Sequence, residues 1–317
     1  MRLPRIAELD ETSSGTGYFL CARKERRTGR NGGVFLSLLL QDVTGEVIAK
    51  VFSDVDENNA QFESGEFVAV MARGNLFNQR FELVVEKIRR VIPEDETRGF
   101  RREDCIPSAP RSADEMWPEL LGRLDGIEDP SLRELVTAMA SEHADKLRVW
   151  PAARQIHHAY RSGLLEHILK IMEVVDFLGH TYGANRDLLI AGAFLHDIGK
   201  LQELEYDVAT DYTAEGNLIG HITIGAGMLR DALRGRPEFP RDLAMQLEHL
   251  ILSHHGALEL GSPVKPLTIE AFILAAADEI DAKLHQVRRH IADDDTPGPF
   301  TAYQRRLDRV LFKPPKP

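Results

Sequence analysis

Histidine and aspartate, two residue types that bind metal ions, gather in the second half of this sequence. Twelve histidines occur in the 317 residues, and seven of them fall in short clusters between positions 157 and 255. The positions of interest are His157, His158, His167, His196, Asp197, His221, His254, His255 and Asp278. Neutral imidazole and carboxylate groups are natural ligands of divalent first-row metals, so this mixture favours manganese, with cobalt, iron or nickel as alternatives. Magnesium is less suited to so many histidines.

Several of these polar residues lie within or directly beside apolar stretches of the sequence. His196 and Asp197 follow the run LLIAGAFL, and Asp278 closes the run AFILAAA. His167 lies within LLEHILKIMEVV, which has helical periodicity. A single histidine on an apolar face is most often a hydrogen-bonded core residue, but a carboxylate there is costly unless it is paired or binds a metal. The occurrence of His167, His196, Asp197 and Asp278 in this order therefore favours a shared metal site over four unrelated core residues.

The order of these residues resembles that of a known superfamily. HD-domain metal-dependent phosphohydrolases carry a histidine, a His-Asp pair and a later aspartate, and His167, His196, Asp197 and Asp278 match that order. Longer phrases are similar to the YhaM-type 3′→5′ exoribonuclease family, in which an OB-fold precedes the HD domain: HHAYRSGLLEH, LIAGAFLHDIGK, GHITIGAGML, LILSHHGALELGSP and AAADEIDAK. The resemblance covers nearly the whole chain. Its motifs are specific in the second part and diffuse in the first.

The resemblance implies a site for two divalent ions. The first ion would be held by His167, His196, Asp197 and Asp278, and the second by His221 and by His254, His255 or both, with Asp197 bridging. Two such ions activate a water molecule and neutralise charge on a phosphodiester. At this point either His254 or His255 is an equally good inner ligand of the second ion.

Other residues near these ligands are candidates for contacting a substrate. Lys200 follows Asp197 by one helical turn and would offer a positive charge to a phosphate oxygen, so Asp197 and Lys200 are the predicted catalytic pair. The alternative for Lys200 is a solvated lysine at a helix end. His157, His158 and Arg161 precede the first ligand, and they either bind substrate phosphate or have an ordinary structural role.

The elements that must position these ligands are helices. Apolar residues recur at three-to-four spacing in residues 112–124, 131–147, 163–182, 186–196, 220–233, 240–253 and 267–289. We therefore expect an all-helical HD domain over residues 112–317, with a short helix from the tail 293–317 packed onto it. Residues 93–111 lose all periodicity and contain several prolines, which predicts an interdomain linker.

The first part of the chain is predicted to be a small β-barrel. Apolar and polar residues alternate in five runs separated by glycine-containing turns, at 18–24, 34–41, 46–52, 67–73 and 80–92. Five strands in about 75 residues are typical of an OB-fold, a barrel that binds single-stranded nucleic acid, so we assign residues 1–92 to one. In the third run Val47, Ala49 and Val51 are expected to face the core.

The opposite face of the barrel strands offers candidates for binding nucleic acid. Aromatic rings stack on bases, and basic side chains bind phosphates. The candidates are Phe35, Lys50, Phe52, Arg73, Phe77 and Arg80. The alternative for each phenylalanine is a place in the core. No tryptophan is available to this face, because Trp117 and Trp150 both follow the predicted linker.

Composition and charge exclude several classes of protein. With 43% hydrophobic and 28% charged residues the sequence is that of a globular protein. The longest apolar run, residues 188–195, is far shorter than the roughly 20 residues of a membrane span, and the amino-terminal MRLPRIAELDE lacks the apolar region of a secretory signal. Cys21 and Cys105 match no metal or disulfide spacing. The net charge of −11, taken alone, argues against a protein that coats nucleic acid through a global positive field. Most of that negative charge lies after residue 110, and the first part of the chain is nearly neutral.

Together with these features, the resemblance to the YhaM-type family implies a cytoplasmic, metal-dependent 3′→5′ exoribonuclease that acts on single-stranded RNA, with single-stranded DNA left open as a substrate. One alternative is an HD phosphohydrolase that acts on a small nucleotide, as a nucleotidase or a cyclic-nucleotide phosphodiesterase. A second is a nucleic-acid-binding protein with a silent HD site, against which the intact ligand set argues. No membrane partner is expected, and the oligomeric state stays open, a homo-oligomer included.

Overall fold

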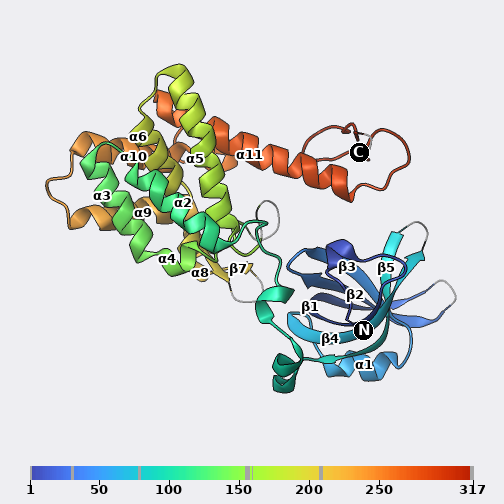
Figure 1. The fold of residues 1–317 in the computed structure, drawn as a ribbon. Coiled ribbons are helices and arrows are strands. Elements are labelled where there is room, and N and C mark those ends of the chain that lie inside the picture. The colour runs from blue at the N-terminus through green and yellow to red at the C-terminus, as the bar shows by residue number, and fades with distance from the viewer. Residues whose placement is uncertain are drawn as a thin grey trace. The chain divides into compact units, whose positions relative to one another are not determined.

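The computed structural model describes residues 2–29, 32–77, 80–153, 158, 160–206 and 210–314. The chain forms two compact units, Met1–Ser108 and Ala109–Pro317, whose elements are labelled in Figure 1. Within the described ranges, no helix combines the length and the apolar character needed to cross a membrane. Each unit is described by itself.

The first unit is a closed five-stranded barrel with the strand order β1-β2-β3-β5-β4. Its strands are β1 (Ser14–Thr28), β2 (Val34–Asp42), β3 (Gly45–Val51), β4 (Glu66–Phe77) and β5 (Arg80–Arg90). β1 is long enough to pair with both β2 and β4, and parallel pairing of β3 with β5 closes the barrel. Closure leaves no open sheet edge. The predicted OB-fold is confirmed.

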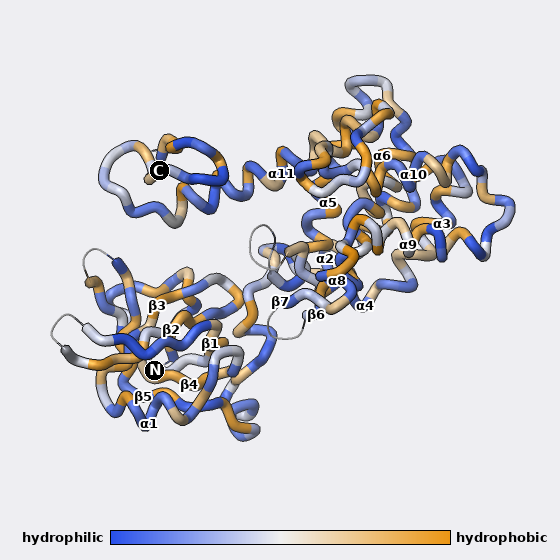
Figure 2. Tube along the Cα trace, turned by 180° about the vertical axis from the view of Figure 1, so that it is seen from behind, coloured by the Kyte–Doolittle hydropathy of each residue, from blue (hydrophilic) through white to orange (hydrophobic). Residues whose placement is uncertain are grey.

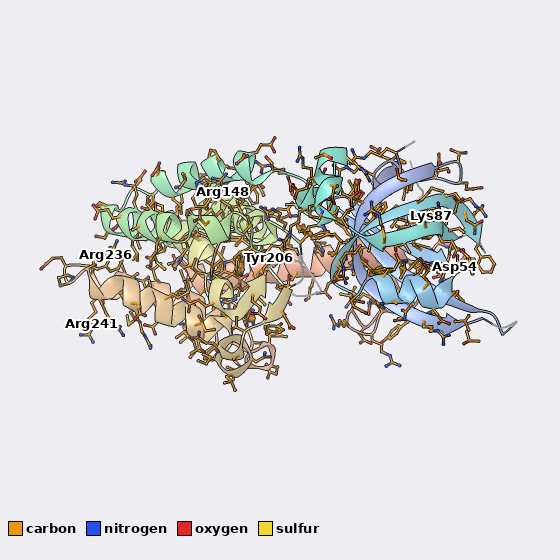
Figure 3. All side chains as sticks on the ribbon, turned by 90° about the horizontal axis from the view of Figure 1, so that it is seen from below. Asp54, Lys87, Arg148, Tyr206, Arg236 and Arg241 are labelled. Atoms are coloured by element: carbon orange, nitrogen blue, oxygen red, sulfur yellow. The ribbon has the colours of Figure 1, made fainter. Side chains whose placement is uncertain are left out.

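Alternation along the strands explains why this sequence closes into a barrel. Val47, Ala49 and Val51 on β3 are buried as predicted, and the same alternation buries every second residue of β2. The helix α1 (Val55–Gln61), between β3 and β4, was not predicted, because its seven residues carry no apolar stripe. Asp54, just before α1, and Lys87 on β5 are exposed side chains of this unit (Figure 3).

The segment predicted as a linker, residues 93–111, is largely folded against the barrel. It contains two short 3₁₀ helices, η2 (Pro93–Arg98) and η3 (Arg102–Cys105), and the first unit extends to Ser108. Asp95 is fully buried, and its carboxylate accepts two hydrogen bonds from Arg89 at 2.6 and 2.8 Å. The ring of Phe100 packs edge-on against Tyr18. Single anchors of this kind leave no periodic signal in a sequence, which is why the segment resembled a linker.

The second unit is built from helices around one hydrophobic core. Its longer helices are α2 (Ala113–Asp125), α3 (Pro130–Glu142), α5 (Gly163–Tyr182), α6 (Arg186–Leu195), α9 (His221–Arg234), α10 (Arg241–Ser253) and α11 (Ile269–Asp293). Its short elements are α4 (Ala144–Leu147), α7 (Lys200–Glu203), β6 (Leu204–Tyr206), β7 (Thr210–Tyr212), α8 (Ala214–Ile219) and η4 (Leu258–Leu260). α6 is apolar around its whole circumference and is buried from Leu188 to Leu195 (Figure 2). The helix predicted for residues 131–147 is interrupted at His143.

The carboxy-terminal tail differs from the prediction. Residues 294–314 form no helix; they fold into a loop whose ends meet through the antiparallel bridge of Phe300 with Phe312. Asp294 closes its base by accepting hydrogen bonds from the Ala302 amide at 2.8 Å and from Lys313 at 2.9 Å. Pro297, Gly298 and Pro299 cannot continue α11, so the chain turns back at this point.

Candidate metal centre

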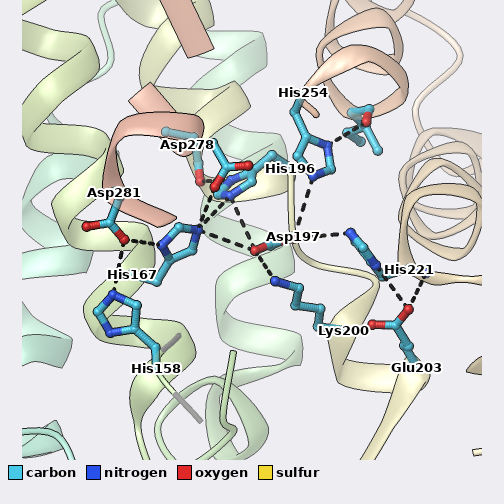
Figure 4. Close-up of polar contacts among 12 residues, drawn as sticks. His158, His167, His196, Asp197, Lys200, Glu203, His221, His254, Asp278 and Asp281 are labelled. Atoms are coloured by element: carbon cyan, nitrogen blue, oxygen red, sulfur yellow. Dashed lines mark hydrogen bonds and ion pairs between the residues drawn. The ribbon is translucent and has the colours of Figure 1, made fainter. Parts of the chain in front are cut away.

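Five helices of the second unit bring the predicted ligands together (Figure 4). His167 comes from α5, His196 and Asp197 directly follow α6, His221 begins α9, His254 directly follows α10, and Asp278 lies on α11. His167, His196, Asp197 and His254 are all at most 2% exposed. These side chains, far apart in the sequence, therefore form one buried polar cluster inside an apolar helical core.

Asp197 stands between two groups of imidazoles. Its Oδ2 atom lies 3.4 Å from Nε2 of both His167 and His196. Its Oδ1 atom lies 3.5 Å from Nε2 of His221 and 3.7 Å from Nε2 of His254. Asp278 adds an oxygen 3.4 Å from Nε2 of His167. Each oxygen of a single carboxylate thus faces a separate set of ligand atoms.

The outer nitrogen of each imidazole is already engaged, which assigns the inner nitrogen as a lone pair. Nδ1 of His196 lies 2.8 Å from the Ala193 carbonyl oxygen, and Nδ1 of His254 lies 2.8 Å from that of Ile251. Carbonyl oxygens only accept, so each Nδ1 carries the proton and each Nε2 presents a lone pair to the centre. This orientation by an outer hydrogen bond is characteristic of histidines that bind metals.

The centre of the cluster is electrostatically incomplete without a cation. Nε2 of His167 and Nε2 of His196 are 3.1 Å apart, so two lone pairs would repel one another there. Burial lowers the pKa of His167, but hydrogen bonds with Asp197 and Asp278 outweigh it and raise that pKa well above the ordinary value.

Three further buried atoms of the cluster have no hydrogen-bond partner among the described residues: Asp197 Oδ1, His221 Nε2 and His254 Nε2. Leaving buried polar atoms unpaired is costly, at about 1–3 kcal/mol each. Burial also lowers the pKa of His254 well below its ordinary value, so this imidazole is neutral and able to bind a metal. The imidazole and carboxylate atoms of the cluster therefore fit a divalent cation.

The comparisons with known proteins place both units in one family. The family model of the HD domain matches residues 164–283, and that of the OB-fold nucleic acid binding domain matches residues 19–91. The chain is 34% identical to the 3′-5′ exoribonuclease YhaM of Oceanobacillus iheyensis over 303 residues, which cover 94% of this chain and 93% of the relative. It is 32% identical to that of Bacillus subtilis over 301 residues, which cover 94% of each chain. This chain belongs to the YhaM family of 3′-5′ exoribonucleases.

A carboxylate missed by the sequence analysis supports the first ligand of this YhaM-family chain. Oδ2 of Asp281 accepts hydrogen bonds from Nδ1 of His167 at 3.0 Å and from Nε2 of His158 at 3.1 Å. Burial raises the pKa of Asp281, but the two histidines lower it further, so the carboxylate is ionised. The spacing of Asp278 and Asp281 by three residues places both on one face of α11, and this was the available signal.

His158 does not have the surroundings expected of a phosphate ligand. It is buried, and both ring nitrogens are engaged: Nε2 by Asp281, and Nδ1 by Glu166 at 2.8 Å and by the Tyr160 hydroxyl at 2.9 Å. These contacts favour the structural role that the sequence left open for His158, because its ring orients Asp281. His157 lies outside the described residues. Arg161 is half-buried and is not among the residues that line the cleft beside the metal centre.

A second supporting carboxylate, Glu203 on α7, holds His221. Its Oε1 atom accepts hydrogen bonds from the His221 backbone amide at 2.9 Å and from Nδ1 of the same residue at 3.0 Å. A glycine at position 199 lets the start of α7 lie close to the start of α9, because a Cβ atom there would be only 2.0 Å from the His221 carbonyl oxygen. Nothing in the local sequence distinguished Glu203 from a surface glutamate.

Lys200 and His255 lie at the edge of the cluster, where a cleft of about 790 Å³ opens. Lys200 is buried, and its ammonium group lies 2.6 Å from Asp197 Oδ2. Burial lowers its pKa, but the charge of Asp197 raises it more, so Lys200 is a cation. Nδ1 of His255 lies 2.8 Å from the Leu260 carbonyl oxygen. His221, His254 and His255 each offer one ring nitrogen to a metal ion, and these three atoms lie within 4.8 Å of one another.

The barrel gathers its predicted nucleic-acid-binding residues on one outer face. They are Phe35, Lys50, Phe52, Arg73, Phe77 and Arg80. Arg73 is opposite Val84 on β5, and Val84 is opposite Lys50 on β3, so the set is continuous across the strands. The rings of Phe35 and Phe52 are 5.6 Å apart, and the Lys50 ammonium lies 4.9 Å from the centre of the Phe77 ring.

One acidic residue on this face was not foreseen. Glu82 on β5 forms an ion pair with Lys50 at 2.6 Å and accepts a hydrogen bond from Asn75 at 3.1 Å. The pair removes the net positive charge at the centre of the face. Phe52 and Phe77 remain 55% and 54% exposed, so the face offers aromatic surface more than charge.

Proposed function

We propose that this chain is a metal-dependent 3′→5′ exoribonuclease that releases mononucleotides from single-stranded RNA. The observation that carries the proposal is Asp197, whose two oxygens each face a separate set of imidazoles in a chain that also holds an OB-fold barrel. An RNA substrate agrees with the cytoplasmic location predicted from the sequence.

We assign the ligands to two ions, for which manganese is the preferred metal and cobalt, iron and nickel are alternatives. The first ion would be held by His167, His196, Asp197 and Asp278, and the second by Asp197, His221, His254 and His255. Between His254 and His255, we favour His254 as the inner ligand, because its unpaired Nε2 atom is the one buried against Asp197. When bound, the two ions would activate a water molecule and neutralise charge on the phosphodiester.

The protein's own groups prepare this site in three ways. Asp281 and Glu203 hold the rings of His167 and His221, so their lone pairs stay directed at the centre. The apolar core around the cluster excludes bulk water, which strengthens every electrostatic interaction inside it. Lys200 lines the cleft while paired with Asp197, and its remaining N–H groups can donate to a non-bridging phosphate oxygen.

We assign strand binding to the outer face of the barrel. Phe35, Phe52 and Phe77 would stack on bases, and Arg73 and Arg80 would contact phosphates, whereas the ammonium group of Lys50 is already paired with Glu82. Stacking is tolerant of sequence, because every base has a π-face, and this suits an enzyme that degrades a strand residue by residue.

The test is manganese-dependent degradation of a single-stranded RNA of about 20 nucleotides, longer than the usual site of one OB-fold, labelled in parallel at the 5′ and 3′ ends. The expected result is a shrinking ladder from the 5′ label and immediate release of mononucleotide from the 3′ label. Asp197→Asn, which alters both predicted ion sites, is expected to be inactive. A DNA strand of the same sequence tests the contribution of the 2′-hydroxyl.

An intact strand together with hydrolysis of free nucleotides would contradict the proposal in favour of an enzyme acting on small nucleotides. Metal binding without any hydrolysis would favour a nucleic-acid-binding protein with a silent site.

A further inference from the structure

The cleft beside the metal centre extends well beyond the ligands. Lys200, His221 and Asp278 line one end, and Gln286 on α11 lines the other. Asp278 and Gln286 are eight residues apart on one helix, which corresponds to about 12 Å along its axis. The cleft is thus longer than a single phosphodiester requires.

The far end of the cleft is completed by the carboxy-terminal loop, residues 294–314. Arg306 and Leu307, at the tip of this loop, line the same cleft as the metal ligands. The loop is held to the last turns of α11, because Nε2 of His290 donates to the Ala302 carbonyl oxygen at 3.0 Å. Its two arms are joined by the Thr301 amide, which donates to the Leu311 carbonyl oxygen at 2.8 Å. These hydrogen bonds hold the two arms of the loop together and attach the loop to α11, so the tip has a defined position.

Arg306 is the cation of this loop that lines the cleft. Its backbone amide donates to Gln304, but its guanidinium makes no hydrogen bond or ion pair with any residue in the part of the chain that the structure describes. The other cation at this end, Lys283, is paired with Glu279 on the same helix at 2.5 Å. A guanidinium presents a fork of donors that matches two oxygens of a phosphate.

The lining around Arg306 suits a nucleotide as well as a phosphate. Leu307 and Leu260 contribute apolar surface to the cleft, and Tyr212 contributes an aromatic ring. A nucleotide carries both a phosphate and the apolar face of a base, whereas a simple phosphate ester carries no base. The extended cleft therefore has the chemistry of a second nucleotide position.

We propose that Arg306 binds a backbone phosphate of the RNA strand on the 5′ side of the scissile bond and so gives the catalytic unit its preference for a strand over a small phosphodiester. This proposal rests on the exoribonuclease function proposed above. Arg306 is a specificity-determining residue in this account, and the carboxy-terminal loop is part of the substrate site.

The test compares two substrates in the full-length, manganese-loaded enzyme: a single-stranded RNA of about 20 nucleotides and bis(p-nitrophenyl) phosphate, a diester too short to reach the loop. For Arg306→Ala, the ratio of kcat/KM for the strand to kcat/KM for the diester is expected to fall about tenfold, as for loss of one charge-assisted hydrogen bond. Arg306→Lys, which keeps the charge but not the fork, is expected to recover part of the ratio.

Arg305→Ala is the matched control, because Arg305 is an exposed arginine on the same loop that does not line the cleft. A second readout is the salt dependence of KM for the strand: the slope of log KM against log salt is expected to flatten by about 0.7 in Arg306→Ala, the value for one phosphate contact on a single strand. A merely structural role of the loop would leave that slope at the wild-type value.

Equal substrate ratios and equal salt slopes for Arg306→Ala and Arg305→Ala would overturn the proposal. A wild-type enzyme that hydrolyses the diester but leaves the strand intact would be a different failure, because it would overturn the exoribonuclease function itself.

Discussion

Replacing Asp281 by asparagine is expected to weaken the binding of the ion held by His167 without unfolding the protein. Asparagine keeps the shape of the side chain but removes the charge that orients His167 from 3.0 Å away. Loss of such a supporting carboxylate typically costs 10- to 100-fold in metal affinity. Because one oxygen of Asp281 serves both His167 and His158, and because the residue is only 5% exposed, we expect about 100-fold, or roughly 2.7 kcal/mol.

The assay is calorimetric titration of the metal-free protein with Mn²⁺ at constant pH. The wild-type protein is expected to bind two ions, and Asp281→Asn is expected to lose affinity at one of them while the site on the His221 side is little changed. Asp231→Asn on α9 is the control, because it removes an equal charge from an exposed ion pair, with 64% of the Asp231 side chain accessible. That variant is expected to stay within about twofold of wild type. Wild-type affinity at both sites in Asp281→Asn would refute the positioning role, and melting of the metal-free variant shows separately whether it folds.

Three further predictions test other parts of the structure. The hydrogen bonds from Arg89 lower the pKa of Asp95 below its ordinary value of 3.8, so the ionised carboxylate stabilises the barrel at pH values above about 4. Asp95→Asn is expected to lower the free energy of unfolding by about 2 kcal/mol at neutral pH. In urea titrations the difference from wild type should shrink as the pH falls below about 4. Phe52→Ala is expected to weaken binding of single-stranded RNA by about 1–3 kcal/mol in fluorescence anisotropy, whereas Phe177→Ala, an exposed phenylalanine of the helical unit, should not; equal effects would exclude the barrel face as the stacking surface. Gly199→Ala places a methyl group against the His221 carbonyl oxygen, so it is expected to lower the melting temperature and to weaken binding of the second ion in the same titration; unchanged values would show that α9 accommodates the methyl group.

Much of the fold could be predicted because its signals are local. The periodicity over residues 163–182 has the same bounds as α5, and the alternation at Val47, Ala49 and Val51 assigned the buried face of β3. The ligand order was also readable, since imidazoles and carboxylates stand out within apolar runs. The barrel and the HD domain were therefore identifiable from the sequence.

Two adjacent residues show where local signals end. In the sequence, His254 and His255 are equivalent, yet the end of α10 buries the first against Asp197 and leaves the second at the cleft. Asp281 and Glu279 are equally acidic neighbours on α11, but only Asp281 is packed against His167. The difference is made by which side of each helix the other helices cover, and no short window of sequence contains that information.

The sequence by itself determined the residue types of the site, their order and the two kinds of domain that carry them. Only the tertiary structure decided that Asp197 presents one oxygen to each group of imidazoles, that His158 is enclosed rather than available to substrate, and that the carboxy-terminal loop lines the cleft. Helical and strand periods are properties of neighbouring residues, whereas the direction of a side chain and its partners depend on packing between segments distant in the chain.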